Sequence, residues 1–320
     1  MSGNRKEWLP RVVGFLVVAG MMAVMVTGWS QQKQSRKKTA KSDSLATVTS
    51  DSIVTMGTDL GMINDSLRIA DSIAQWRDSV KITSLRKVRN VAFGVGERLV
   101  FDVNYGFITA GEAVMSVVRL DSVAGRQCYR VEFTVNSLPS FDWIYTVRDR
   151  YLTFIDTETI APWRFEQHIR EGSYRRDFVA EFDQYRLVAR TTEGDHDIPE
   201  YVHDIMSAFY YARTLDFSGY NVGDGPLLYN FFRKKSHELK IRFLGRQELE
   251  IEAGTFKTIV LEPIVKEGGL FKSEGRIVIW LTDDDRKIPV RVNTKVLVGS
   301  IDTELREYSG ILGPTTARIR

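Results

Sequence analysis

From residue 91 onward, apolar and polar residues alternate along the chain in short runs that are separated by turn-forming residues. Such a run gives a strand one apolar face, because successive side chains of a β-strand point to opposite sides. Residues 98–105, 129–135 and 175–182 show the pattern clearly, and similar runs return about every 8–12 residues. This spacing predicts an all-β domain over residues 91–310, built as one large curved antiparallel sheet or half-barrel.

One segment of this domain has helical rather than strand spacing. Ile205, Phe209 and Ala212 fall on one side of a helix, and Asp204 precedes them. Aspartate is well suited to capping the first turn of a helix. We therefore expect one helix near residues 204–215, packed against the sheet.

Two stretches of the domain share a pattern in which a strand runs into an acidic turn and a proline opens the next strand. They are residues 152–163 and 279–290, and their first turn aspartates are Asp156 and Asp283. An aspartate can accept hydrogen bonds from the backbone of a turn, and proline is tolerated where a strand begins. Either an internal duplication or the repeated use of a favourable turn explains the pattern.

Residues 1–30 have the features of a membrane-targeting segment. Residues 12–29 form an uncharged, apolar run, and three basic residues precede it. A run of this kind is typical of a signal peptide or of a membrane anchor. Five basic residues follow between positions 33 and 41, and the positive-inside rule would place them in the cytoplasm. We nevertheless expect export, with the segment either cleaved or kept as an inner-membrane anchor.

Residues 31–90 are expected to connect this segment to the sheet as a polar tether. Residues 31–70 are rich in Ser, Thr, Lys and Asp, a composition that cannot bury a hydrophobic face. Residues 71–87 differ, because their apolar side chains recur at helical spacing, and we expect an amphipathic helix there. At the other end of the chain, residues 311–320 are expected to form a frayed tail.

The distribution of charge argues against a nucleic-acid partner. Of the 44 basic and 41 acidic residues, the first 90 positions hold 14 and 7, which leaves 30 basic and 34 acidic residues in the sheet domain and tail. A nucleic-acid-binding domain normally concentrates positive charge on its fold. The single cysteine, Cys128, excludes a disulfide framework within one chain.

No pattern in the sequence has the spacing of a catalytic or metal site. The pairs His196-Asp197 and His203-Asp204 lack firm metal-ligand spacing. The aspartates at 283–285 lack the glycine and the alternating ligands of a calcium loop. The sequence contains neither the nucleophile motif of α/β-hydrolases nor a phosphate-binding loop. We expect no metal, no cofactor and no catalytic residue.

Aromatic residues give the strongest indication of a ligand site. Tyrosine and tryptophan combine an apolar body with a polar tip, which suits the wall of a ligand cleft. Phe141, Trp143 and Tyr145 are expected to alternate on one strand face, and Phe209 and Tyr210 to lie on the helix. An ordinary hydrophobic core would explain the same residues. The candidate ligand-binding residues are Phe141, Trp143, Tyr145, Trp163, Phe209, Tyr210, Tyr229, Phe231 and Trp280.

Four blocks of the domain resemble a bacterial family, domain-of-unknown-function family 3108. They are residues 96–111, 204–213, 253–257 and 279–290, of which the last is the most specific. The resemblance covers about residues 91–310 and implies an exported or envelope-associated protein of Gram-negative bacteria without an assigned activity. The strand–Asp–Pro–strand units also resemble, at the level of the fold, those of LolA/LolB-type lipoprotein carriers, whose half-barrels hold acyl chains.

These features are compatible with three functions. We expect first a non-enzymatic protein of the periplasm or cell envelope that binds a lipid-like, apolar or amphipathic ligand in the concavity of the sheet. The alternative is a structural or assembly factor that docks another envelope protein. The third is a hydrolase acting on envelope polysaccharide, with residues such as Glu97, Asp284 or His203. An uncleaved N-terminal segment would add association with the membrane.

Overall fold

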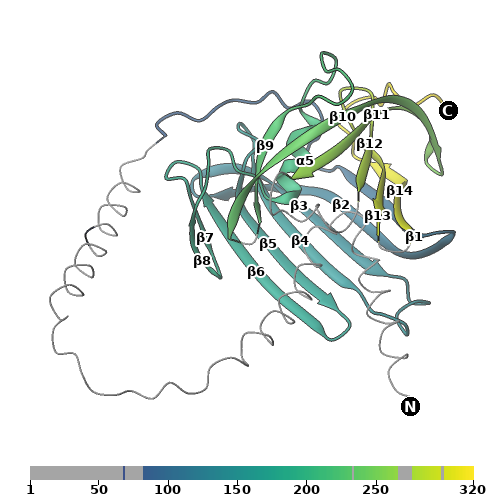
Figure 1. The fold of residues 1–320 in the computed structure, drawn as a ribbon, viewed down its shortest axis with the longest axis horizontal. Coiled ribbons are helices and arrows are strands. Elements are labelled where there is room, and N and C mark those ends of the chain that lie inside the picture. The colour runs from purple at the N-terminus through teal and green to yellow at the C-terminus, as the bar shows by residue number, and fades with distance from the viewer. Residues whose placement is uncertain (1–67, 69–81, 233, 266–275, 297–298) are drawn as a thin grey trace, which may run out of the picture.

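One antiparallel sheet of fourteen strands forms the body of the protein (Figure 1). The structure is a computed structural model that describes residues 68, 82–232, 234–265, 276–296 and 299–320. Every pair of neighbouring strands in the sheet is antiparallel. The sheet is strongly curved but not closed, because β8 and β9 remain as its two edges. The predicted all-β class and the curved antiparallel sheet are confirmed.

The strands are joined mostly by short turns, and one helix interrupts the series. The elements are β1 Arg98–Tyr105, β2 Ile108–Val123, β3 Arg126–Ser137, β4 Arg148–Asp156, β5 Pro162–Glu171, β6 Tyr174–Asp183, β7 Val188–Thr191, β8 Gly194–Asp197, α5 Ile205–Arg213, β9 Leu227–Phe232, β10 Lys235–Ile251, β11 Gly254–Val265, β12 Ile277–Thr282, β13 Pro289–Lys295 and β14 Ser300–Ser309.

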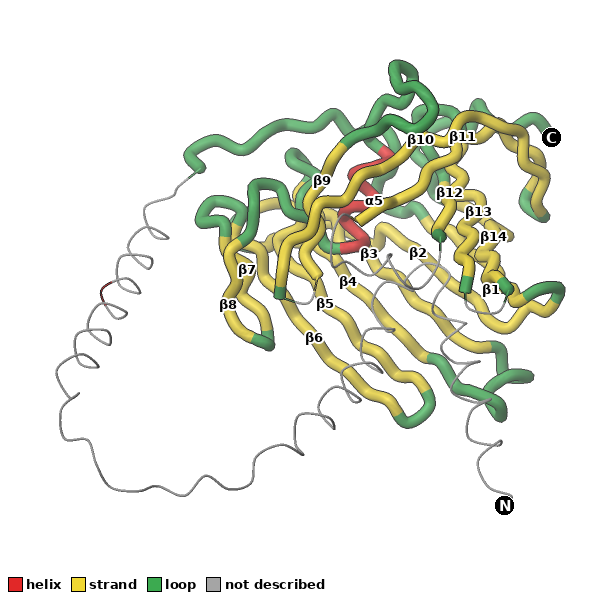
Figure 2. Tube along the Cα trace, in the orientation of Figure 1, coloured by secondary structure: helices red, strands yellow, loops and turns green. Residues whose placement is uncertain are grey.

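The chain builds the sheet in two passes that meet at its centre. Strands β1 to β8 follow in order toward one edge, and β9 to β14 return from the other edge until β14 pairs with β1. The two edges approach each other at one corner. There Phe231 of β9 packs against Phe182 and His196, with 5.8 Å between ring centroids in each case. The sheet therefore wraps around a concave interior (Figure 2).

Helix α5 lies in this interior and is fastened at its start by its capping residue. Asp204 Oδ1 accepts hydrogen bonds from the backbone N–H groups of Met206 and Ser207, at 2.8 and 3.0 Å, as the sequence predicts. The other carboxylate oxygen accepts a hydrogen bond from the Thr153 hydroxyl of β4 at 2.8 Å. The same side chain thus begins the helix and holds it to the sheet.

A buried ion pair fastens the other end of α5 to the start of β1. The guanidinium of Arg213 donates to both carboxylate oxygens of Glu97 at 2.7 Å, and neither side chain has exposed surface. Arg213 also donates to the carbonyl oxygens of Ala92 and Arg286, at 3.3 and 3.2 Å. Charges removed from water need close partners of this kind. Loss of either Glu97 or Arg213 would therefore leave the charge of the other buried without a partner.

The two turns with a shared sequence pattern also share a structure. Asp156 Oδ1 accepts hydrogen bonds from the backbone N–H groups two and three residues later, at 2.8 and 3.0 Å. Asp284 does the same in the second turn at 3.0 and 3.2 Å, in place of the preceding Asp283. Pro162 and Pro289 then begin β5 and β13. The predicted turn chemistry is confirmed, with the acceptor one residue later in the second turn.

Strand β10 runs without interruption from Lys235 to Ile251, although Gly245 lies within it. Its register against β11 shifts between Phe243 and Gly245, and Gly245 has a φ of +119°. A bulge of this kind keeps two strands paired while it breaks their alternation. In the sequence Gly245 therefore looks like a turn residue, although in the structure it lies at a bulge inside the strand.

The segment before the sheet differs from the helix predicted at 71–87. Residues 82–87 are not helical, and the rest of that helix lies outside the described residues, as does the predicted membrane segment. The Leu85 side chain packs against an apolar cluster that contains Cys128 and Trp163, so packing overrides helical spacing. Among the described residues, no helix has the length and apolar character needed to cross a membrane.

The C-terminal residues are docked on the sheet and are not frayed. The Lys257 N–H donates to the Ala317 carbonyl at 2.9 Å, and the Ile319 N–H donates to the Thr255 carbonyl at 2.8 Å. The Ala317 N–H also donates to Asp284 Oδ2 at 3.0 Å. Because backbone groups make these contacts, the side-chain pattern of the tail does not predict them.

Candidate functional site

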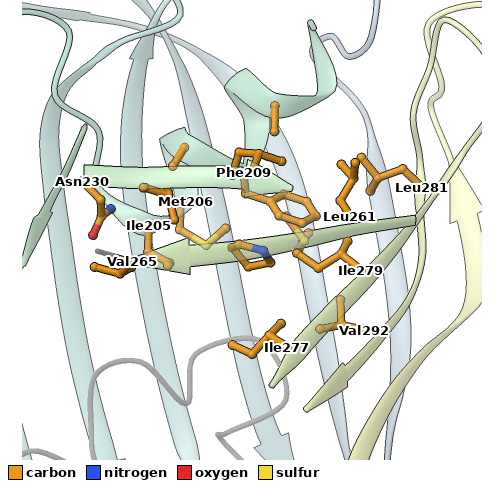
Figure 3. A pocket seen from close by; sticks show the side chains of 16 residues that line it. Ile205, Met206, Phe209, Asn230, Leu261, Val265, Ile277, Ile279, Leu281 and Val292 are labelled. Atoms are coloured by element: carbon orange, nitrogen blue, oxygen red, sulfur yellow. The ribbon is translucent and has the colours of Figure 1, made fainter. Parts of the chain in front are cut away.

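The concave interior contains an apolar cavity between α5 and strands β10 to β13 (Figure 3). Its volume is about 80 Å³. Sixteen residues line it, and of these described residues Asn230 alone has a hydrogen-bonding side chain. The lining residues are Met115, Ile205, Met206, Ala208, Phe209, Ala212, Asn230, Leu239, Ile241, Leu261, Pro263, Val265, Ile277, Ile279, Leu281 and Val292.

Strand alternation and one helix face explain why these side chains converge. Ile277, Ile279 and Leu281 are alternate residues of β12, so they point to the same side of the sheet. The Phe209 ring extends from α5 toward this wall (Figure 3). Apolar walls give water no hydrogen-bonding partner, and the cavity is several times larger than the roughly 10–15 Å³ that one water molecule needs. The site therefore favours an apolar occupant over water.

The polar group of the cavity lies at one end of it. Asn230 is on the edge strand β9, away from Leu281 at the opposite end (Figure 3). Its side-chain amide donates to the carbonyl oxygen of His203 at 3.2 Å. An apolar cavity with one amide at its end can orient a molecule that has an apolar body and a polar head.

His203 is buried beside this amide and is held in its neutral form. Burial and the positive charge of Arg86 lower the pKa of His203 to about 3. Neither ring nitrogen has a hydrogen-bond partner among the described residues, and the ring lies 4.9 Å from that of Tyr211. His203 is therefore a buried, uncharged but polar side chain at neutral pH, and it is 1% exposed.

A pair of buried carboxyl groups lies on β4 and β5, away from the cavity. Asp149 accepts hydrogen bonds from the backbone N–H of Arg170 at 2.8 Å and from the Tyr151 hydroxyl at 3.5 Å. Burial raises the pKa of Asp149 to about 6. Burial and the nearby Asp149 charge raise the pKa of Glu171 to about 9. The two carboxyl groups therefore hold a proton between them at neutral pH.

The predicted aromatic residues do not gather at one site. Phe209 lines the cavity, whereas Tyr210 lies fully buried against Phe93, with ring centroids 4.7 Å apart. Trp163 belongs to a separate cluster, and its indole N–H donates to Asp156 at 2.9 Å. Each of these rings except Phe209 has a packing role apart from the cavity.

The remaining predicted aromatic residues of the second pass lie on β9 and β12. Phe231 joins the two sheet edges, and Tyr229 is partly exposed on β9. Trp280 points away from the cavity, because it alternates with Ile279 on β12, and the Arg291 guanidinium lies 5.5 Å from its ring centre. Of the nine candidates, the structure brings one into the cavity lining.

Phe141, Trp143 and Tyr145 lie in the loop between β3 and β4, so the predicted strand face is wrong. The Tyr145 N–H donates to the Phe141 carbonyl at 3.0 Å, which is the hydrogen bond of a helical turn. Asp142 stabilises this loop by accepting a hydrogen bond from the Ser137 hydroxyl. Alternation over only five residues could not distinguish this turn from a strand.

The three residues considered for hydrolysis occupy separate positions with structural contacts. Glu97 pairs with Arg213, Asp284 accepts turn hydrogen bonds, and His203 is buried as described above. No group of three or more His, Cys, Asp or Glu side chains in the described part of the chain is arranged to hold a metal ion.

The geometry defines a protein with an open, curved antiparallel sheet whose internal helix covers an aliphatic cavity. The chain belongs to the family described as Protein of unknown function (DUF3108), whose model matches residues 100–306. No curated relative matches it.

Several solved structures are similar to the chain. A β-barrel-like protein of the family DUF1849 from Brucella abortus has a TM-score of 0.45 and 11% identity, over 71% of this chain and 99% of the other. A protein with a YmcC-like fold from Bacteroides fragilis has a TM-score of 0.33 and 11% identity, over 71% and 100%. A hypothetical protein of Chlamydia trachomatis has a TM-score of 0.33 and 9% identity, over 72% and 94%.

Proposed function

We propose that this protein binds an apolar or amphipathic, lipid-like molecule in the cavity beside α5, as a non-enzymatic protein of the cell envelope. The lining of the cavity carries the proposal, because fifteen of its sixteen side chains are apolar and the other is Asn230. No lining residue within the described ranges titrates, which supports binding rather than acid–base chemistry.

The chemistry of the lining favours a ligand with an alkyl portion. Burial of apolar surface stabilises a complex by about 25 cal/mol per Å², and aliphatic side chains from β10 to β13 supply such a surface. The Asn230 amide would then bind the polar end of the ligand. A location on the periplasmic side is supported by the apolar run at residues 12–29 and the basic residues before it.

We expect a photoreactive group in the cavity to capture a lipid. Phe209 is replaced by benzoylphenylalanine in the full chain, cells are irradiated, and the denatured protein is extracted with organic solvent and weighed by mass spectrometry. A covalent adduct of lipid mass is expected at this position. The same amino acid in place of Trp280, which points away from the cavity, should give none.

A variant that fills the cavity provides the matched control. Ile279→Phe should abolish the adduct at a cost of no more than about 1–3 kcal/mol in the free energy of unfolding. Val278→Phe lies on the same strand and points to the other face, so it should leave the adduct intact. Equal yields from positions 209 and 280, or no adduct at 209, would refute the proposal. A protein adduct at 209 would favour the assembly-factor alternative.

A further inference from the structure

One rim of the sheet carries the turns that face away from the C-terminal end of α5 (Figure 2). Four neighbouring turns, β13–β14, β1–β2, β3–β4 and β5–β6, lie side by side there. The strand pairings fix this order, since β14 pairs with β1, β2 with β3, and β4 with β5. We call the described residues of these turns, 295–296, 299–300, 105–108, 138–147 and 171–174, together with the adjoining Arg175, the turn rim.

The turn rim exposes two large aromatic side chains. Phe107 is 97% exposed and Trp143 is 82% exposed, the two highest values for large hydrophobic residues in the described chain. Ile108, beside Phe107, is 42% exposed. The start of the β3–β4 loop is held beside β2, because the Leu138 N–H donates to the Ala110 carbonyl at 3.0 Å. Aromatic side chains held in water on adjacent turns form a surface suited to a less polar environment.

Two positive charges that have no carboxylate partner among the described residues flank these aromatic residues. On one side, the Arg175 guanidinium donates only to the carbonyl oxygens of Gly172 and Tyr174, at 2.7 and 2.9 Å. On the other side, Lys295 is exposed at the end of β13 and forms no ion pair with a described residue. By contrast, Arg306 on the sheet is paired with two carboxylates at 2.6 Å. The turn rim thus has one cation without a described carboxylate partner on each side of Phe107 and Trp143, which form its apolar tip.

We infer that the turn rim is a docking surface for an anionic lipid bilayer. Phe107 and Trp143 enter the headgroup region, where aromatic rings are stable, and Arg175 and Lys295 face lipid phosphates. Charge complementarity favours a bilayer over a protein partner. A bilayer presents phosphates over its whole surface, so it can meet Arg175 and Lys295 together although they lie on opposite sides of Phe107 and Trp143. The inference concerns the rim alone and does not depend on a ligand in the cavity.

A fluorescent label at the tip of the turn rim tests this assignment in the full chain. Phe107→Cys is labelled with a nitrobenzoxadiazole maleimide, and the protein is reconstituted into phosphatidylcholine vesicles with or without one quarter phosphatidylglycerol. Native Cys128 will not compete for the label, because it is fully buried and burial raises the pKa of its thiol to about 12. Nitroxide lipids labelled near the headgroup should quench the label at position 107, and more strongly with phosphatidylglycerol.

Matched variants separate docking of the rim from attachment of the chain elsewhere. Val95→Cys places the label at a half-exposed site before β1, at the other end of the sheet, and should show no quenching. Arg175→Glu with Lys295→Glu should lower the ratio of docked to undocked label at least about fivefold. The cavity variant Ile279→Phe should leave the quenching unchanged, so failure of the ligand proposal would be seen separately.

Two results would overturn the inference. One is equal quenching at positions 107 and 95, which would mean that the rim has no preferred contact with the bilayer. The other is a label at 107 that stays in water on both kinds of vesicle, as expected if the exposed aromatic residues serve a protein partner instead.

Discussion

Arg213→Met is expected to lower the free energy of unfolding by about 3–5 kcal/mol. The substitution leaves the Glu97 carboxylate buried without the two hydrogen bonds of 2.7 Å that it accepts from Arg213. Desolvation of an unpaired charge has no compensation in the interior. Because the pair joins the end of α5 to the start of β1, the loss should also loosen the helix over the cavity. Urea unfolding followed by circular dichroism measures the change.

Two further variants make this prediction specific. Glu97→Gln combined with Arg213→Met removes both charges and should recover part of the lost stability. Arg306→Met removes a pair whose residues are partly exposed, and it should cost no more than about 1 kcal/mol. A loss for Arg213→Met as small as that for Arg306→Met would contradict the structural role given to the buried pair.

The stability of the protein is expected to fall as the pH rises from about 5 to about 9. The folded-state pKa of Asp149 is about 6 and that of Glu171 is about 9, while both lie near 4 in an unfolded chain. The contribution of the pair is therefore complete at acid pH and is lost as the pH rises through the folded values, because the unfolded state loses its protons first. We expect a decrease of several kcal/mol, because a difference of one in pKa corresponds to about 1.4 kcal/mol.

Glu171→Gln should remove most of this dependence on pH. The glutamine amide of this variant can donate to the Asp149 carboxylate at any pH. The Glu171 carboxyl can donate only while it is protonated. Urea titrations at acid, neutral and alkaline pH provide the comparison. His203→Phe is the control for the opposite dependence on pH. Because the pKa of His203 is lowered in the folded state, this residue reduces the stability of the fold only as the pH falls below about 6.5. An unsubstituted protein that is equally stable at acid and alkaline pH would contradict the prediction.

The sequence predicts the fold well because alternation and capping are local signals. The run at 98–105 becomes β1 with the predicted bounds, and Asp204 caps α5 as expected. Predictions failed where a distant contact decides the conformation. Leu85 is not helical because it packs against a cluster on the sheet, and residues 317–319 are ordered by backbone pairing with β11. Neither contact leaves a trace in the local pattern.

The candidate site was less predictable than the fold. Alternation in β12 indicates that Ile277, Ile279 and Leu281 are buried, but it cannot show whether neighbouring side chains fill the space beside them. The aromatic residues have the chemistry of a ligand site, yet most of them pack in the core or in loops. The cavity arises where α5, a helix of nine residues, is too short to cover the aliphatic face of four strands, which is a property of the assembled sheet.

The pairing of β1 with β14 also governs the order in which this chain can be made. The Arg306 guanidinium of β14 donates to the Asp102 carboxylate of β1 at 2.6 Å, although the two residues are 204 positions apart. Hairpins β1 to β8 can form as soon as they leave a ribosome or a translocation channel, but β1 keeps an unpaired edge until the final strand emerges. Unpaired edges promote aggregation, and distant pairings slow folding. The two halves of the sheet therefore stay separate until β14 has formed, and truncation before residue 300 would split the sheet at its centre.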